Sequence, residues 1–313
     1  MTPEFAVLEG EALTMLHELN DSKANTCVTS PPYWRKVDYK HPDQLGWEKT
    51  PEQFVSRLAN IFDGVKRVLR DDGTLWVVID DTYFKKELAG VPWLLAFEMK
   101  RRGWIWRAEI VWAKPGCKPE AAKDRPTRSH ESVLLFTKKR AGYYFNQMLD
   151  PHTNPWAIDC IKKAQETGQT ERPRSNPFSK EERRAKGTSG ITRAEYGALM
   201  NPDGKNKRDV WTVKTKWFKK LHFAVYPEEL IEPCIKACCP PGGLVIDPFA
   251  GAGTTGIVAV RNGMNFVGIE LVPESAKLAR EEIKLALQAQ YGQGTAAGPL
   301  DVTSDIEGQV SST

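Results

Sequence analysis

Apolar residues follow two different spacings in the first part of the chain, residues 1–139. Over 51–69 they recur at the i, i+3, i+4 and i+7 positions of one helix face, and Thr50-Pro51 has the residue types of a helix N-cap and first helical position. Over 75–79 they form a short β-rich run, preceded by the turn signal Asp71-Asp72-Gly73. Further strands are predicted at 105–112 and 132–137. Strands that alternate with helices predict an α/β fold with a parallel sheet.

This alternation stops between 140 and 221, where Asn-Pro pairs recur at Asn154, Asn176 and Asn201 with glycines between them. We predict little regular structure there and interpret the segment as an insertion or small subdomain. The alternation resumes over 222–288. Helices are predicted there at 227–239, 254–262 and 273–288, and strands at 244–246 and 265–271. Residues 289–313 are rich in Gly, Ser, Thr and Ala, which predicts a disordered tail.

Composition excludes several classes of protein. A chain of 313 residues, 41% of them hydrophobic, can bury a full core as one large domain or two ordinary ones. It has no apolar run near the ~20 residues that span a bilayer, and no basic and then apolar N-terminus that would direct secretion. Its six cysteines form no CxxC pair and have no histidine at ligand spacing. We therefore expect a cytoplasmic protein without a membrane segment, a structural metal or disulfides.

Positive charge is concentrated in one segment. Residues 160–220 hold 16 Lys and Arg against 7 Asp and Glu, whereas the whole chain has a net charge of only +4. Such a basic block is typical of a surface that binds a polyanion, and aromatic residues interleaved with it favour nucleic acid. A solvated loop region with surplus lysines remains the alternative.

A strand that ends in an acidic residue and leads into a glycine-rich turn is predicted at Val245-Ile246-Asp247-Pro248-Phe249-Ala250-Gly251-Ala252-Gly253-Thr254-Thr255. Gly251 and Gly253 allow close approach of the backbone to a ligand. Glu270 follows 23 residues after Asp247, near the ~20-residue spacing of acids that bind ribose hydroxyls in nucleotide-binding folds. The segment lacks GxGxxG, and a carboxylate beside the turn favours a cation over a pyrophosphate. This pattern predicts a nucleotide-like, cationic cofactor; a plain tight turn is the alternative.

The second chemical motif is Ser30-Pro31-Pro32-Tyr33, after a predicted strand that ends at Val28. Two prolines fix the backbone and remove its N–H groups. The Ser30 hydroxyl and the Pro31 carbonyl can then both accept hydrogen bonds from one exocyclic amine. These bonds localise the nitrogen lone pair for attack, and Tyr33 offers a ring for stacking a base taken out of a duplex. A rigid turn before an aromatic anchor is the alternative.

Together the two motifs resemble the catalytic and S-adenosyl-L-methionine (AdoMet) motifs of amino-group DNA methyltransferases. The catalytic motif comes first, which is the order of the beta group of that family. The resemblance extends over about residues 5–288 and includes the segments 67–75, 125–131 and 222–227. It implies an α/β, Rossmann-like sheet of seven mostly parallel strands with an inserted target-recognition region. It also implies base flipping and AdoMet as the methyl donor.

Residue roles follow from the same resemblance. Ser30, Pro31, Pro32 and Tyr33 would be catalytic; Asp247 would face the methionine part of AdoMet, and Glu270 would hold its ribose. Glu11 stands where the family often has an aspartate near the adenine. The implied cofactor site comprises Asp247, Pro248, Phe249, Gly251, Gly253, Thr254, Thr255, Glu270, Glu11 and Phe223.

The implied organisation is a catalytic half at 1–139, a target-recognition insertion at 140–221, an AdoMet-binding half at 222–288 and the tail at 289–313. Candidate DNA contacts are Arg125, Arg128, Lys205, Lys207 and Arg208. The expected partner is double-stranded DNA in a bacterial cell or phage-infected host. A cognate restriction endonuclease and a homodimer stay open.

The expected reaction is methylation of cytosine N4, because serine at position 30 is more usual among N4-cytosine enzymes. N6-adenine methylation on the same scaffold is the alternative, and methylation of a non-DNA amine or amide is disfavoured by the basic insert. A DNA-binding module without turnover conflicts with two intact motifs. Cys234 follows a proline, as the nucleophile of cytosine C5 methylation does, but its place on the apolar face of a predicted helix indicates a core residue.

Overall fold

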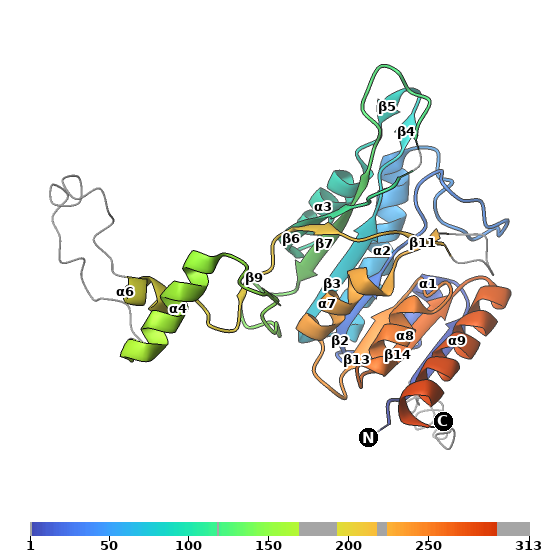
Figure 1. Cartoon of the computed structure of the whole chain (residues 1–313). Coiled ribbons are helices and arrows are strands. Elements are labelled where there is room, and N and C mark those ends of the chain that lie inside the picture. Colours follow the sequence, from blue (N-terminus) through green and yellow to red (C-terminus); the bar gives the residue numbers. More distant parts are fainter. Residues whose placement is uncertain (1, 118, 169–192, 218–223, 293–313) are drawn as a thin grey trace. The chain divides into compact units, whose positions relative to one another are not determined.

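A central β-sheet joins the two ends of the chain (Figure 1). The computed structural model describes residues 2–117, 119–168, 193–217 and 224–292. In their order across the sheet, the strands are β1 (Phe5–Glu9), β14 (Asn265–Glu270), β13 (Leu244–Asp247), β2 (Ala24–Thr29), β3 (Leu69–Ile79), β7 (His130–Thr137), β6 (Ile105–Ala113) and β10 (Val210–Thr212). Among these eight, β7 pairs antiparallel with both neighbours and the other pairings are parallel.

Helices cover both faces of this sheet (Figure 1). One face carries α1 (Ala12–His17), α2 (Pro51–Val68) and α3 (Val91–Arg101), and the other carries α7 (Glu228–Cys238), α8 (Thr254–Arg261) and α9 (Pro273–Tyr291). Successive side chains of a strand point to opposite faces. Thus Leu75 and Val77 of β3 join the core under α2, whereas Trp76 between them donates a hydrogen bond to Cys238 of α7. Burial on both faces explains the continuously apolar strands.

Helix α2 has the start that the sequence predicts. The Thr50 hydroxyl accepts a hydrogen bond from the Gln53 N–H at 3.3 Å, and Pro51 is the first helical residue. Its buried face includes Phe54, Leu58 and Phe62. Capping and this apolar face together explain why the helix forms here.

The strand order places the two chemical motifs side by side. From β2 the chain moves to β3 on one side, whereas β13 continues to β14 on the other. β2 and β13 are neighbours in parallel register, with Thr26 opposite Val245 and Cys27 opposite Ile246. A doubly wound sheet binds ligands beyond the carboxyl ends of strands where the order reverses. Ser30 follows β2 there, and Pro248 follows β13.

Two details of the sheet differ from the sequence prediction. The short strand β10 adds an eighth strand beside β6 to the seven expected. In addition, Asp71-Asp72-Gly73 is no separate turn: β3 starts at Leu69, and the pairing with β2 shifts between Ala24 and Thr26. The sheet absorbs these extra residues as an irregularity, which local turn propensity does not reveal.

Residues 147–208 form a compact unit of their own, distinct from the unit made by 1–146 and 209–313. It contains β8 (Leu149–Asp150) paired antiparallel with β9 (Lys205–Asn206), α4 (Pro155–Thr167) and α6 (Arg193–Ala198). The expectation of little regular structure is therefore wrong for α4. Asn154 is its N-cap and accepts a hydrogen bond from the Trp156 N–H at 3.0 Å, so an Asn-Pro pair starts a helix here.

Smaller elements complete the described structure. β4 (Tyr83–Phe84) and β5 (Glu87–Leu88) form a hairpin, and β11 (Lys216–Trp217) pairs with β12 (Ala224–Val225). Helix α9 continues to Tyr291, three residues into the predicted tail, while 293–313 lie outside the described residues. Within the described part of the chain, no helix is both long and apolar enough to cross a membrane.

Candidate active site

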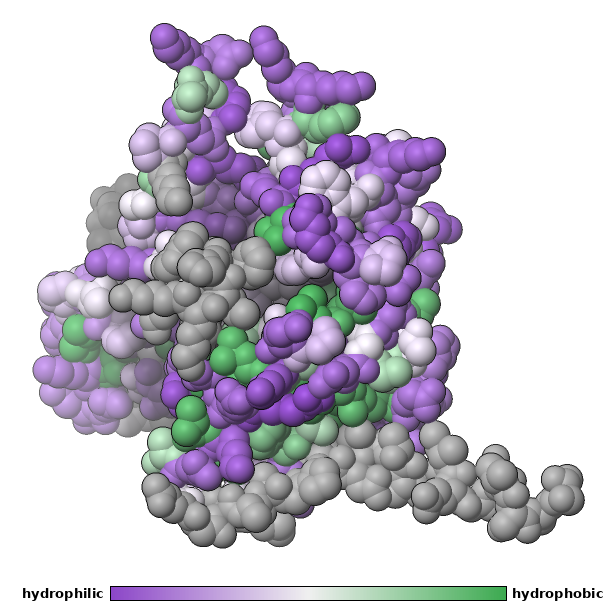
Figure 2. Space-filling view, turned by 90° about the vertical axis from the view of Figure 1, so that its right-hand side faces the viewer, coloured by the Kyte–Doolittle hydropathy of each residue, from purple (hydrophilic) through white to green (hydrophobic). Residues whose placement is uncertain are grey.

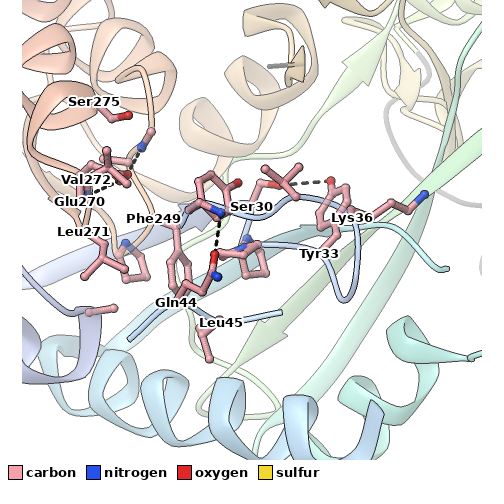
Figure 3. A pocket seen from close by; sticks show the side chains of 18 of the residues that line it. Ser30, Tyr33, Lys36, Gln44, Leu45, Phe249, Glu270, Leu271, Val272 and Ser275 are labelled. Atoms are coloured by element: carbon pink, nitrogen blue, oxygen red, sulfur yellow. Dashed lines mark hydrogen bonds between the residues drawn. The ribbon is translucent and has the colours of Figure 1, made fainter. Parts of the chain in front are cut away.

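One cavity of about 720 Å³ opens beyond the carboxyl ends of the strands. In Figure 3, Glu270, Leu271, Val272 and Ser275 lie at one end, Phe249, Gln44 and Leu45 in the middle, and Ser30, Tyr33 and Lys36 at the other end. Residues of both predicted motifs therefore line the same space. The space-filling view shows a face of the molecule on which hydrophobic residues gather between hydrophilic ones (Figure 2).

Glu270 is the acid at the first end of the cavity. Its two carboxylate oxygens accept hydrogen bonds from the backbone N–H groups of Gly251, at 2.8 Å, and Val272, at 2.9 Å. Burial raises the pKa of Glu270, and these hydrogen bonds act in the opposite direction. A carboxylate oxygen has more than one lone pair, so both oxygens can still accept a hydroxyl of a ligand.

The glycines of the turn serve different purposes. Gly251 lines the cavity with φ +53°, and a side chain there would enter open space, since the nearest atom is Phe249 O at 4.0 Å. Gly253 has φ +84°, and a Cβ there would lie 3.1 Å from the Ala279 backbone of α9. Gly251 therefore keeps space for a ligand, and Gly253 lets α9 approach the turn.

Asp247 corrects one expectation, because its side chain does not face the cavity. It is completely buried and accepts hydrogen bonds from the hydroxyls of Thr29, Thr255 and Tyr226 and from the Phe249 N–H, at 2.6, 2.6, 3.0 and 3.0 Å. Burial raises the pKa of Asp247, against the effect of these donors. Asp247 therefore holds the two motifs together and is not among the residues that line the cavity.

The other predicted cofactor residues divide between two positions. Those that line the cavity are Glu11, Pro248, Phe249, Gly251, Thr254 and Glu270. Gly253 and Thr255 do not: Thr255 is fully buried and bonded to Asp247, and Phe223 lies outside the described residues. Glu11 also caps α1, since its carboxylate accepts a hydrogen bond from the Thr14 N–H at 2.8 Å.

Ser30, Pro31, Pro32 and Tyr33 all line the opposite end. The Ser30 hydroxyl donates to the Tyr33 hydroxyl at 3.2 Å, and Tyr33 donates to a Glu131 carboxylate oxygen at 2.8 Å. Trp34, the next residue, is buried and packs edge-on against Phe84, with ring centroids 5.4 Å apart. This packing holds the adjoining Ser30-Pro31-Pro32-Tyr33 motif in place.

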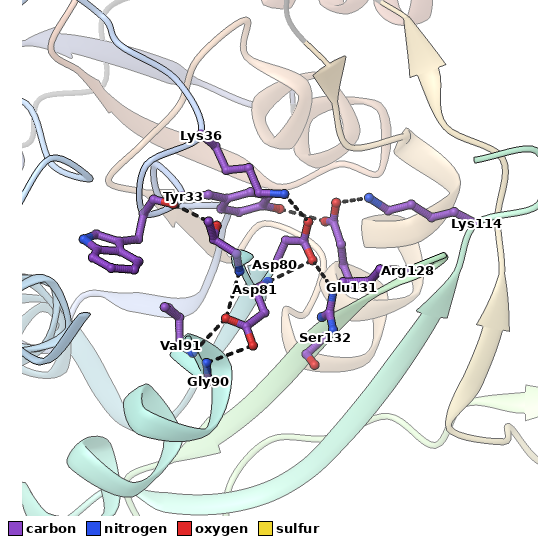
Figure 4. Close-up of polar contacts among 12 residues, drawn as sticks. Tyr33, Lys36, Asp80, Asp81, Gly90, Val91, Lys114, Arg128, Glu131 and Ser132 are labelled. Carbon is purple, nitrogen blue, oxygen red and sulfur yellow. Dashed lines mark hydrogen bonds and ion pairs between the residues drawn. The ribbon is translucent and has the colours of Figure 1, made fainter. Parts of the chain in front are cut away.

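Three charged side chains meet beside Tyr33 (Figure 4). Asp80 lines the cavity and forms ion pairs with Lys36, at 3.2 Å, and Arg128, at 2.9 Å. The Arg128 side chain is only 11% exposed. In this structure the Arg128 guanidinium is engaged by Asp80, and the phosphate contact expected of it stays a prediction. Asp81 has a different role: its carboxylate accepts hydrogen bonds from the backbone N–H groups of Gly90 and Val91 at the start of α3.

The other predicted DNA contacts are more open. Arg125 is 26% exposed, pairs with Glu120 and lies 3.6 Å over the Tyr83 ring. Lys205 contacts Thr153 at 3.5 Å and Lys207 pairs with Asp150 at 3.1 Å, both within residues 147–208. Arg208, the last residue of that unit, is exposed.

Cys234 is fully buried in α7, where its thiol contacts the Leu230 carbonyl at 3.7 Å, and burial raises its pKa well above the ordinary value. The interpretation as a core cysteine is confirmed. No group of three or more His, Cys, Asp or Glu among the described residues could hold a metal ion.

Several residues of the cavity were not predicted. Tyr39, Gln44 and Leu45 come from the segment between Tyr33 and α2, and burial raises the pKa of Tyr39 to about 12, with Glu270 contributing. Lys114 and Glu131 come from the adjoining ends of β6 and β7. The position of Lys114, two residues after the predicted strand 105–112, was a usable signal; only the sheet order shows which residues it meets.

Comparison with known proteins agrees with this geometry. A family model described as DNA methylase matches residues 24–281. The chain belongs to the DNA methylase family. It is 37% identical over 302 residues to the type II methyltransferase M.Cfr9I of Citrobacter freundii, covering 87% of this chain and 85% of that protein.

Solved structures share the fold of this DNA methylase. The PvuII DNA methyltransferase, titled cytosine-N4-specific, is 17% identical with a TM-score of 0.61, covering 94% of this chain and 95% of that one. A DNA modification methylase of Thermus thermophilus, complexed with S-adenosyl-L-methionine, is 24% identical with a TM-score of 0.57, covering 91% and 96%. The chain is therefore an AdoMet-dependent DNA methyltransferase of α/β fold.

Proposed function

We propose that this enzyme methylates the exocyclic N4 amine of cytosine in double-stranded DNA, with the target base turned out of the duplex. The observation that carries the proposal is that Ser30 and Tyr33 line the same cavity as Phe249 and Glu270. One cavity then holds an acceptor for an amine and a site for a nucleoside. The serine at position 30 favours cytosine over adenine, and the PvuII enzyme of the same fold is titled cytosine-N4-specific.

The residues at the first end fit AdoMet. The Glu270 carboxylate is held by two backbone N–H groups and has lone pairs for the ribose hydroxyls. Phe249 offers a ring in the middle of the cavity, and the acids Glu11 and Asp43 also line it, which suits a ligand with two positive groups. When bound, AdoMet supplies a methyl group on a positively charged sulfur. The turn at Gly251 leaves the space for it.

The residues at the other end would receive the target base. Tyr33 would stack on it, while the Ser30 hydroxyl and the Pro31 carbonyl accept hydrogen bonds from its amine. An aromatic amine is a weak nucleophile because its lone pair is delocalised into the ring. Two acceptors on its hydrogens localise that pair without a strong base.

Residues 147–208 would form the core of the target-recognition region within 140–221. Lys205, Lys207 and Arg208 of this unit, together with Arg125, are our candidates for phosphate contacts. The proposal leaves 1–139 as the catalytic half and 222–288 as the AdoMet half. Its natural setting is the cytoplasm of a bacterial cell with a cognate restriction endonuclease; sedimentation would test for a homodimer.

The proposal is tested by incubating the enzyme with labelled AdoMet and unmethylated genomic DNA and identifying the methylated nucleoside by mass spectrometry. N4-methylcytosine is the expected product. N6-methyladenine would overturn the choice of base while leaving amino methylation intact. Calorimetric binding of AdoMet without any methylated nucleoside would overturn DNA as the substrate.

A further inference from the structure

A chain of polar contacts runs from Ser30 away from the cavity (Figure 4). Ser30 contacts Tyr33 at 3.2 Å, Tyr33 contacts Glu131 at 2.8 Å, and the other Glu131 oxygen meets the Lys114 ammonium. Lys114 directly follows β6, and Glu131 lies near the start of β7, opposite Trp112. The Glu131 side chain is 7% exposed, so its carboxylate depends on these two partners.

The Glu131 carboxylate determines which hydroxyl is the donor in each hydrogen bond between Ser30, Tyr33 and Glu131. An ionised carboxylate can only accept hydrogen bonds, so Tyr33 must donate its single hydroxyl hydrogen to Glu131. The Ser30–Tyr33 contact then has to use the hydrogen of Ser30. The lone pairs of Ser30 are left as acceptors, which is the state that an amine hydrogen requires.

The Lys114 ammonium beside the Glu131 carboxylate favours its ionised form. This ammonium forms an ion pair with the Glu131 carboxylate. Both side chains are mostly buried, with 18% of Lys114 and 7% of Glu131 exposed. Removing a buried carboxylate from water without a cation would favour its protonated form. A protonated Glu131 could itself donate to Tyr33, which would release Ser30 from its fixed orientation.

We propose that Glu131 is a positioning residue of the methylation site: through Tyr33, it holds the Ser30 hydroxyl as an acceptor for the target amine and takes up the proton that the amine releases. The inference rests on the proposed amino methylation. The amine nitrogen bonds the methyl carbon while the carbon–sulfur bond breaks toward sulfur, and the nitrogen then carries one proton too many. That proton passes to Ser30, the Ser30 proton to Tyr33, and the Tyr33 proton to Glu131.

The first test is the single-turnover rate of Glu131→Gln and Tyr33→Phe. A glutamine turns an NH2 donor toward one of the two donors, Lys114 or Tyr33, and cannot take up a proton. Phenylalanine keeps the ring but breaks the chain. Each rate should fall about 10²-fold, the usual effect of a positioned proton acceptor. AdoMet affinity by calorimetry, and flipping of a 2-aminopurine placed at the target, should stay at the wild-type level.

Glu109→Gln is the matched control. Glu109 lies on β6, is partly buried and accepts a hydrogen bond from Ser132 at 2.9 Å, but it does not line the cavity. It should keep the wild-type rate. The proposed function is read from which base becomes methylated in the wild type, whereas this inference is read from rate ratios on that base, so either can fail alone.

The second test is the pH profile of Lys114→Met. The wild-type rate should fall on the acid side as Glu131 takes up a proton, and loss of the cation should move that fall to higher pH. Burial lowers the pKa of Lys114 to about 8. Lys114 is therefore a cation below that pH, on the acid side of the profile where the rate falls. The other titratable or charged groups that face this pair are Tyr33, Lys36, Asp80, Cys117 and Arg128.

Three results would overturn the proposal: a wild-type rate for Glu131→Gln, a loss of AdoMet affinity equal to its loss of rate, or an unchanged acid limb in Lys114→Met. If Glu131→Gln does not fold, as judged from its circular dichroism and thermal unfolding, the rate of Tyr33→Phe and the profile of Lys114→Met decide the question.

Discussion

The Thr29 hydroxyl donates a 2.6 Å hydrogen bond to the Asp247 carboxylate, across 218 positions of the chain. Thr29 is the last residue of β2 and Asp247 the last of β13. The residues that follow them, Ser30 and Pro248, both line the cavity. This bond therefore sets the position of the amine site relative to the cofactor site.

Thr29→Val should destabilise the fold and weaken AdoMet binding, because it removes a donor from a buried carboxylate. We expect about 2 kcal/mol in chemical denaturation, the usual value for a hydrogen bond to a charged group. Thr26→Val is the control: Thr26 is buried on the same strand and bonded to Thr74 at 2.8 Å, outside the cavity. It should lower stability without changing AdoMet affinity; equal losses of affinity would refute the role given to Thr29.

Ser30→Ala should lower the methylation rate by about 10²–10³-fold, the range found when one polar group at a reacting centre is removed. AdoMet affinity should stay close to wild type, because Ser30 lies at the far end of the cavity from Glu270. Single-turnover kinetics and calorimetry measure the two quantities. A parallel loss in both would mean that the two ends of the cavity are assigned wrongly.

Glu270→Gln should weaken AdoMet binding by about tenfold to a hundredfold, since it replaces a charged acceptor. The pH dependence has a definite sign. Burial raises the pKa of Glu270 above 4.5, so on acidification the carboxylate takes up a proton earlier than an ordinary glutamate and loses an acceptor. Wild-type affinity should therefore begin to fall above pH 4.5. Over the pH interval in which the wild-type affinity falls, the AdoMet affinity of Glu270→Gln should not change.

Arg125 and Arg128 should differ in DNA binding. Arg125→Gln should weaken DNA affinity and lower its salt dependence by about one unit of slope, as loss of one phosphate contact does. Arg128→Gln breaks the ion pair with Asp80 and should reduce turnover without changing that slope. Fluorescence anisotropy at several salt concentrations separates the two effects. The same slope change in both variants would show that Arg128 contacts a phosphate as Arg125 does.

Local pattern was enough for much of this protein. Helix α2 was predicted with its cap at Thr50, and the strands around Val245 and Phe266 from their apolar runs, because these signals lie within a few residues of one another. The motifs at Ser30 and Asp247 identified the chemistry for the same reason. Even α4, which we missed, had a local signal in Asn154-Pro155 and in Ala157, Cys160 and Ile161 on one face.

Tertiary structure decided what those residues do. The sequence placed Asp247 in a motif and implied cofactor contact, but strand order buries it against Thr29 and Tyr226, because β13 lies beside β2. Likewise, only the pairing of β6 with β7 brings Lys114 to Glu131 and so to Tyr33. Propensity and periodicity act between near neighbours in the chain, whereas the direction of a side chain, its burial and its partners depend on contacts between distant segments.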